Sequence, residues 1–355
     1  MPKIEEVVDR IRELETLRRD TAEFLNDEEI DSLVSGVMAE KEFIKDVGSI
    51  ELDSFRVSGV DGGLIKKEYA GIDVVLSRAV AALFEFEDGK LENTENIPEN
   101  LMLPDVQYIE SPLDRRSFNL SSSFIRLHKE ISIAIEALER DPDMVLLDGS
   151  IIPQYSERPD KGTEARKLYD DLIEKYEELF EKVLDKGILL AGVIEDSRSK
   201  RFCEEIADQD FISGEKERVL RNTRDTNMLE YLMDRGERTG VMKYAKEYEK
   251  HVVLNDIGDK AKRVRNFYLK TVSDASPVRI DFLETDSTEV TADTISERLL
   301  PLCSYSSTYG IPSVLVEADR RAKLSGDDLE RFESRLSVLG PLPGIKSLRR
   351  NNRPF

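Results

Sequence analysis

Two short, wholly apolar segments separated by one long amphipathic segment constrain the fold of this chain most. Residues 144–147 (MVLL) and 187–194 (GILLAGVI) have the length and apolar character of strands buried on both faces. Between them, apolar residues recur at helical spacing, and Gly187 stands where a left-handed helix cap is expected: Leu168, Leu172, Tyr176, Leu179 and Val183 form the stripe. Alternation of strand and helix predicts an α/β fold with a mixed sheet flanked by helices.

The remaining segments extend this pattern and suggest three parts. We expect strands in FRVSGVDGG (from Phe55), GIDVVLSRAVAALFEF, NFYLKTV and PVRIDFLE, and a helix over about 121–140. Residues 1–50 predict a helical N-terminal extension, with Phe24, Ile30, Leu33 and Val37 continuing its pattern, which either packs on its own domain or contacts a second copy or a partner. The main domain would span 51–325 with a helical insertion at about 203–265, and 326–355 would form a C-terminal helix and a basic tail.

Composition excludes several classes of protein. No apolar run reaches the roughly 18 residues of a membrane span, and the acidic N-terminus lacks a signal sequence, so we expect a cytoplasmic protein without membrane association. Only two histidines and two distant cysteines are present, which argues against a zinc ribbon or a histidine-centred triad. The net charge of −21 argues against simple coating of DNA, but not against an enzyme whose carboxylates hold metal ions.

An aspartate followed by glycine is predicted to end two of the strands. Asp61 lies in VSGVDGG and Asp148 in VLLDGS. The carboxyl ends of parallel neighbours open into one crevice, where two carboxylates repel unless a divalent cation such as Mg²⁺ or Mn²⁺ neutralises them. The alternative is that each Asp-Gly pair is only a turn.

Other polar residues could join this crevice, and each has a purely structural alternative. Arg126 and Glu130 are four residues apart and could form only a surface ion pair. The segment after Ile194, with Glu195, Asp196, Ser197 and Lys200, could orient a phosphate or cap a helix. Asp319 could pair with the arginines beside it. The clusters RVLRNTRDTN and KAKRVRNFYLK, the second interleaved with aromatics, suit single-stranded nucleic acid or are solvated faces.

The order of VDGG, RLHKE, LLDGS, EDSRSK, FYLK with VRIDF, and YGIPSVLVEAD over about 55–325 resembles the NurA nuclease family. The resemblance implies an RNase H-like catalytic domain in which Asp61, Glu130 and Asp148 bind two divalent ions, Mn²⁺ or Mg²⁺. Asp319 stands where the family usually has histidine and would be a further ligand, and Lys200 would join the catalytic residues. Arg126, Asp196, Ser197, Tyr268 and Asp281 would support the substrate.

The same resemblance implies partners and a biological role. The protein would be a homodimer that acts on single- and double-stranded DNA ends as a 5′ to 3′ exonuclease and an endonuclease. It would work with the hexameric HerA helicase-translocase in end resection and double-strand break repair. Two alternatives remain: an RNase H-fold actin-like ATPase or kinase, although the last third has no GxGxxG, and an inactive docking scaffold.

Overall fold

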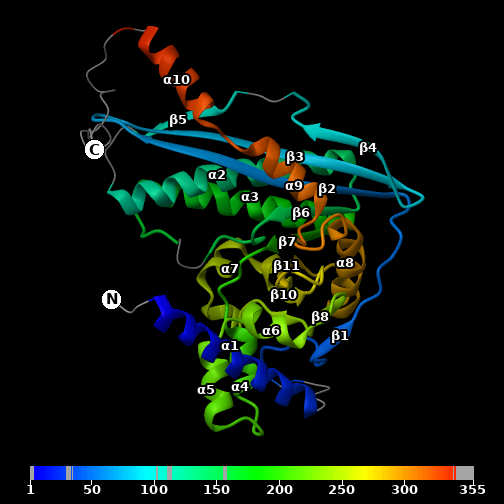
Figure 1. Ribbon diagram of the computed structural model, residues 1–355. Coiled ribbons are helices and arrows are strands. Elements are labelled where there is room, and N and C mark those ends of the chain that lie inside the picture. Colours follow the sequence, from blue (N-terminus) through cyan, green and yellow to red (C-terminus); the bar gives the residue numbers. More distant parts are fainter. Residues whose placement is uncertain are drawn as a thin grey trace.

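The computed structural model describes residues 4–28, 33, 35–100, 103–109, 114–154, 158–338 and 340. Its centre is one large mixed sheet with helices on both faces (Figure 1). The strand order is β1-β8-β10-β11-β7-β6-β2-β3-β4, with β5 beside β3 and β9 beside β10. No helix in the described ranges is long and apolar enough to cross a membrane.

One half of the sheet contains four of the strands that the sequence predicted, together with β4 at its edge, which was not among the predicted strands. It is formed by β2 (Phe55–Glu68), β3 (Asp73–Glu87), β4 (Lys90–Ile97), β6 (Met144–Asp148) and β7 (Leu189–Ile194). β6 pairs parallel to β2 on one side and to β7 on the other, whereas β2, β3 and β4 are antiparallel. Fully apolar β6 and β7 are buried because helices cover both faces. This confirms the predicted α/β class, and the order β4-β3-β2-β6-β7 is compatible with an RNase H-like sheet.

Two pairs of helices cover the two faces. α2 (Arg115–Ala137) and α3 (Glu164–Lys186) form one apolar core with the sheet, and Gly187 caps α3 with a φ of 68° as predicted. α8 (Thr288–Cys303) and α9 (Ser313–Ala322) form the core on the other face. α9 lies against the backbone of β2, since a Cβ on Gly63 would stand 2.1 Å from the carbonyl oxygen of Ala322. Because Gly59 and Gly63 have no side chain, α9 can lie directly against β2 in the middle of the sheet.

The second half of the sheet carries a separate helical layer. Its strands are β1 (Ile44–Asp46), β8 (Glu237–Thr239), β9 (Met242–Lys243), β10 (Val264–Leu269) and β11 (Val278–Leu283). A third apolar core joins α1 (Ile4–Asp27) to α4 (Arg201–Ala207), α5 (Gly214–Asn222) and α6 (Asp225–Leu232), at the lower end of Figure 1. The remaining elements are β5 (Asp105–Ile109), α7 (Val252–Ile257) and α10 (Gly326–Val338).

Two expectations about the chain's organisation need correction, and a third lies outside the described residues. Residues 35–50 are not helical: they contain β1, which pairs with β8, so the N-terminal segment completes the sheet edge. The 203–265 region is helical only in part, because it also contains β8 and β9. The sequence-predicted basic tail lies at 341–355, outside the described residues.

Candidate active site

Asp61 and Asp148 lie side by side in the middle of the sheet. Val60 of β2 is in register with Leu147 of the parallel strand β6, so the next residues on both strands are the two aspartates. Asp61 was predicted to follow a strand, but β2 continues to Glu68 and places Asp61 in its middle. β6 does end at Asp148. β2 therefore continues for seven residues past the point where its parallel neighbour stops. The predicted meeting of two parallel strands is confirmed, although only one aspartate stands at a strand end.

Glu130 reaches the same place from α2, past Gly62. A Cβ at Gly62 would stand 2.3 Å from Oε1 of Glu130, so only glycine lets this carboxylate lie against β2. Glu130 is 6% exposed, and Nη1 of Arg126 donates to its Oε1 at 2.5 Å. The predicted ion pair of Arg126 and Glu130 therefore exists, but it points into the protein beside the two aspartates.

A cavity of about 380 Å³ opens at the carboxyl ends of β6 and β7. Its lining brings together acids from three segments: Asp148 from β6, Glu195 and Asp196 after β7, and Asp319 from α9. Tyr309 closes one side and donates its hydroxyl to Oε1 of Glu195 at 3.1 Å. Asp196 and Asp319 are exposed, so they are free to meet a ligand that enters from solvent.

The electrostatics of the site show an excess of negative charge. Burial raises the pKa of Glu130 to about 8, and Asp61 and Asp148 reinforce the shift against the opposing effect of Arg126. Desolvation by the surrounding protein raises the pKa of Asp148 to about 7, and repulsion from the charges of Asp61 and Glu195 raises it further. Burial also raises the pKa of Asp61, which the Gly62 N–H, donating at 2.6 Å, partly offsets. Arg126 is the cation that opposes the shifts of all three acids.

These donors fit a hard divalent cation. Carboxylate oxygens are the ligands that Mg²⁺ and Mn²⁺ prefer, and added positive charge would relieve the mutual repulsion of the acids. The four acids Asp61, Glu130, Asp148 and Asp319 would be the residues that hold it. No three of them have ligand oxygens all within 4.8 Å of one another, and Arg126 holds one oxygen of Glu130.

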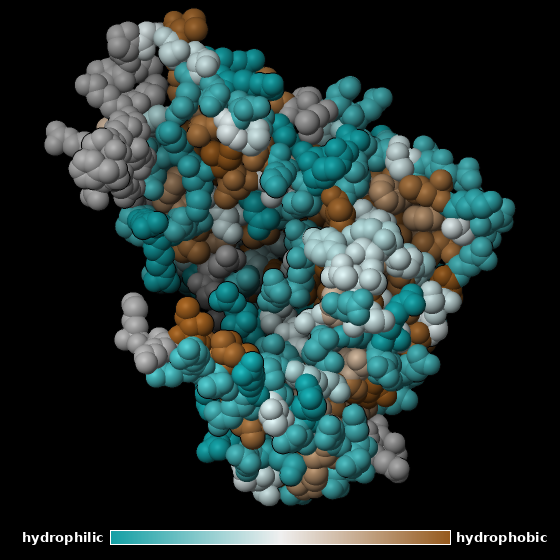
Figure 2. Space-filling model, viewed as in Figure 1, coloured by the Kyte–Doolittle hydropathy of each residue, from teal (hydrophilic) through white to brown (hydrophobic). Residues whose placement is uncertain are grey.

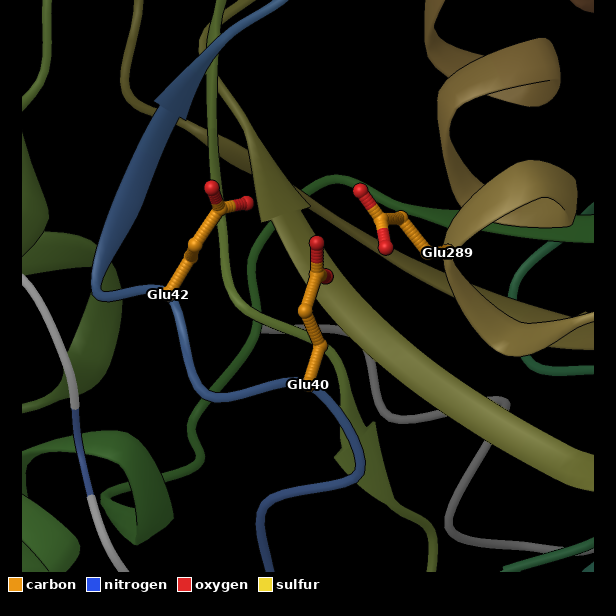
Figure 3. A group of neighbouring side chains, drawn as sticks. All are labelled: Glu40, Glu42 and Glu289. Carbon is orange, nitrogen blue, oxygen red and sulfur yellow. The ribbon is translucent and has the colours of Figure 1, made fainter.

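Within the described residues, the three carboxylates that do approach so closely are Glu40, Glu42 and Glu289, before β1 and at the start of α8 (Figure 3). A cation already lies among them. The Lys45 ammonium is 2.7 Å from Glu289, 3.6 Å from Glu42 and 3.9 Å from Glu40. This second acidic group is therefore an ion-pair network of the protein itself.

Three residues predicted to contact the substrate are buried instead. Asp281 and Tyr268 are fully buried in β11 and β10, and Ser197 is 6% exposed. Tyr268 and its neighbour Phe267 pack in the core, so the basic-aromatic segment does not offer its rings for base stacking. Lys200 is half-buried and immediately precedes α4, so Asp196 and Ser197 do not cap that helix, which begins at Arg201.

Some residues at the cavity were not selected from the sequence. Tyr309 was part of the YGIPSVLVEAD segment, but nothing in its spacing indicated that its hydroxyl faces Glu195. Glu195 was considered with its neighbours and not chosen as a site residue, although the structure places it at the cavity. Ser150 was likewise missed: its hydroxyl donates to buried Asp281 at 2.7 Å, a contact between residues far apart in the sequence.

Comparisons with known proteins agree with this fold. Residues 55–324 match the NurA domain. The crystal structure of the NurA nuclease from Sulfolobus solfataricus is similar to the chain with a TM-score of 0.53, at 17% identity, over 95% of this chain and 97% of that one. A second NurA crystal structure has a TM-score of 0.51 at 12% identity, over 98% and 100% of the two chains.

At such low identity these structures support the fold alone, and no curated protein matches the chain. The domain match, in contrast, covers most of the sequence and includes Asp61, Glu130, Asp148 and Asp319. It begins at the first residue of β2 and ends just after α9, so it coincides with the part of the fold that forms the cavity. The chain therefore belongs to the NurA family.

Proposed function

We propose that the chain is a metal-dependent deoxyribonuclease that hydrolyses phosphodiester bonds at the cavity between β6, β7 and α9. The proposal rests on one observation: β2, α2, β6 and α9 each bring an acid to the same place, and Arg126 is the cation that opposes the pKa shifts of the three acids Asp61, Glu130 and Asp148. Asp61 and Asp148 raise the pKa of Glu130, Asp61 raises the pKa of Asp148, and Asp319 raises the pKa of both aspartates. Such uncompensated charge is costly unless a cation binds.

Bound divalent ions, two in our proposal, would activate a water molecule and stabilise the leaving oxygen of a phosphodiester. The chain's own residues perform the remaining tasks. Asp61 and Asp148 present oxygens from adjacent strands, and Glu130 presents its carboxylate from the opposite helix layer. Asp319 completes the set from α9, where its exposure leaves it accessible to both cation and substrate. Arg126, which pairs with Glu130, would contact a substrate phosphate once a cation neutralises that glutamate.

The net negative charge of the chain and two basic side chains near the cavity affect how it would bind DNA. At a net charge of −21 the chain should bind DNA weakly outside the site. Arg198 is exposed and Lys200 is half-buried in the loop that follows Glu195 and Asp196, two residues that line the cavity, and we propose that both neutralise phosphates near its entrance. We propose that a basic partner delivers the strand and that these residues then receive it.

An exposed apolar stripe supports a docking role for the first helix. Ile4, Val7, Val8 and Ile11 lie on one side of α1 and are between 37% and 83% exposed; Figure 2 shows apolar surface at this end of the molecule. Apolar residues at this spacing suit a helix-packing interface. We propose that this stripe contributes to a homodimer or to a contact with a HerA translocase, and that the assembly acts on DNA ends as a 5′ to 3′ exonuclease and an endonuclease in break repair.

The test is the conservative variant Asp61→Asn in the full-length protein. Mn²⁺-dependent degradation of a labelled oligonucleotide should be lost while circular dichroism and the melting temperature show a folded chain. A wild-type protein that degrades no DNA with Mn²⁺ or Mg²⁺, alone or with a HerA partner, would contradict the proposal and favour the docking scaffold. ATP hydrolysis dependent on Asp61 would favour the actin-like alternative.

A further inference from the structure

We infer that Ser150 and Ser197 are positioning residues that hold Asp148 and Glu195 at the cavity through a buried polar network. The inference rests on the proposed function and adds residues that do not themselves touch substrate. It starts from a repeated pattern: β6 ends at Asp148 and β7 ends just before Glu195, and a serine follows each acid by two positions.

The first serine is anchored to the neighbouring strands. Oγ of Ser150 donates to Oδ2 of Asp281 at 2.7 Å and accepts from the backbone N–H of Ile152 at 3.3 Å. Asp281 is fully buried on β11, and its other oxygen accepts from Nε of Arg279 at 2.7 Å. Tyr244 also hydrogen-bonds to both Ser150 and Arg279. The serine is therefore held by an ion pair that cannot move without repacking the core.

The second serine is anchored in the same way from β10. Oγ of Ser197 lies 3.4 Å from the hydroxyl of Tyr268, which donates to Oδ2 of Asp225 at 2.8 Å. Asp225 is fully buried, and its Oδ1 accepts from the backbone N–H of Cys203 at 2.9 Å. This chain of contacts ties the loop after β7 to α4 and α6.

The two anchors stand next to each other because of the strand register. Tyr268 of β10 is in register with Arg279 of β11, which is in register with Ile194 at the end of β7. Tyr268 and Arg279 thus lie on neighbouring strands next to the end of β7, and neither of them lines the cavity. Each loop is also restrained by its backbone: the Gly149 N–H donates to the Val193 carbonyl at 2.9 Å, and Gly149 adopts a φ of 102°.

The chemical consequence concerns preorganisation. Carboxylates that repel one another move apart unless their backbone is held. Here the repelling carboxylates are Asp148, at the end of β6, and Glu195, just after β7. Groups that orient metal ligands typically change metal affinity or activity by about 10- to 100-fold when they are removed. We therefore expect the serine hydroxyls to act through the position of Asp148 and Glu195.

The experiment measures binding of Mn²⁺ alone by calorimetry, and kcat and KM with an oligonucleotide, in the full-length protein. Ser150→Ala should weaken Mn²⁺ binding and lower kcat by about 10-fold each, with KM for DNA unchanged. Ser150→Thr, which retains the hydroxyl, should restore both. Ser197→Ala should have a smaller effect of a few-fold, because its bond is longer and it supports Glu195.

Two controls separate positioning from general stability. Ser199→Ala removes a hydroxyl in the same loop that accepts from the backbone N–H of Arg201 at 3.2 Å, and it should behave as wild type. A cycle of Ser197→Ala and Tyr268→Phe should be non-additive, because both changes break the same link. If Ser150→Ala lowers the metal-free melting temperature strongly, Ser150→Cys, which keeps the volume with a weaker donor, replaces it.

The outcomes distinguish the inference from the function beneath it. If Asp148→Asn loses Mn²⁺ binding while Ser150→Ala binds Mn²⁺ and cuts DNA as wild type does, the inference is wrong and the proposed function stands. If Asp148→Asn itself retains Mn²⁺ binding and nuclease activity, the proposed site is wrong and the inference fails with it.

Discussion

Two acidic groups, one at the β1 edge of the sheet and one in its middle, behave in opposite ways. In the group of Glu40, Glu42 and Glu289, the carboxylates approach one another most closely, yet cations of the chain neutralise them (Figure 3). Arg238 is fully buried and donates two hydrogen bonds, of 2.6 and 2.7 Å, to the carboxylate of Glu40. Although burial alone lowers the pKa of Lys45, its hydrogen bonds to Asp293 and Glu289 raise that pKa above its usual value.

The acids at the cavity and those beside it are less tightly grouped but poorly neutralised. Glu130, Asp61 and Asp148 share one arginine, and the pKa values of all three are raised. The comparison teaches that closeness of carboxylates does not by itself indicate a metal site. What distinguishes the cavity is negative charge that the protein leaves uncompensated, at a place that solvent and ligand can reach.

The sharpest test compares one acid from each group. Asp148→Asn should lower Mn²⁺-dependent DNA hydrolysis by at least about 1000-fold, since it removes a ligand that acts in the transition state. Glu42→Gln, in the neutralised group, should change the rate by less than about two-fold, because Glu42 is 52% exposed and its ion pair is of the weak surface kind. Equal losses in both variants would erase the distinction between the groups. Single-turnover cleavage of a labelled oligonucleotide measures both.

The arginines of the two groups should differ in their contribution to stability. Arg238→Met leaves Glu40 buried without its partner and should lower the free energy of unfolding by about 3–5 kcal/mol. Arg126→Met should cost less at pH 6, because Glu130, whose pKa is about 8, is then protonated. Urea unfolding of both variants at this pH provides the comparison. A larger loss for Arg126→Met would show that Glu130 is charged in the folded protein.

The close approach of Glu130 to β2 can be disturbed without removing any acid. Gly62→Ala places a methyl group where Oε1 of Glu130 now lies, and the side chain must move. We expect Mn²⁺ affinity to fall by about 10-fold, with a cooperative fold retained. Ala at Gly36, where a Cβ would meet nothing within 4 Å, is the matched control and should leave affinity unchanged. Calorimetric titration with Mn²⁺ would show whether the two glycine variants differ.

The smallest expected effect is on the pH dependence of stability. Because the folded-state pKa values of Asp148 and Glu130 are raised to about 7 and about 8, the folded chain binds more protons than the unfolded chain between pH 5 and 8. The melting temperature of the metal-free protein should therefore fall by a few degrees over this range. Glu130→Gln should flatten this slope, and Glu42→Gln should not. A melting temperature that rises with pH would contradict the assignment of raised pKa values.

Much of the fold could be predicted because the relevant signals are local. The apolar segments ending at Asp148 and Ile194 had to be buried strands, and the periodic residues between them had to form a helix. The N-terminal prediction was wrong over residues 35–50, where weak periodicity suggested helix but pairing of β1 with β8 prevails. An edge strand of three residues is stabilised by its partner, which local propensity does not show.

The candidate site was predictable only in part for a similar reason. Asp61 and Asp148 could be paired from strand ends. Glu130 was a candidate from its helical spacing with Arg126, and its role as a metal ligand came from the resemblance to a family. The burial of Asp281 and Tyr268, and the contact of Tyr309 with Glu195, depend on segments more than 70 residues apart in the chain. The local sequence around Glu40 likewise gave no sign of its pairing with Arg238, 198 residues away.

The amino-acid sequence alone determined which segments are buried strands, which glycines and acids follow one another, and how much negative charge the chain carries. Those properties depend on side-chain chemistry and short spacing. Only the tertiary structure decided which carboxylates are neutralised: Glu40 pairs with Arg238 from a distant segment, whereas Asp61, Glu130 and Asp148 come together from three elements with Arg126 opposing the pKa shifts of all three. Electrostatic energy depends on distance in space and on burial, and neither is a property of position along the chain.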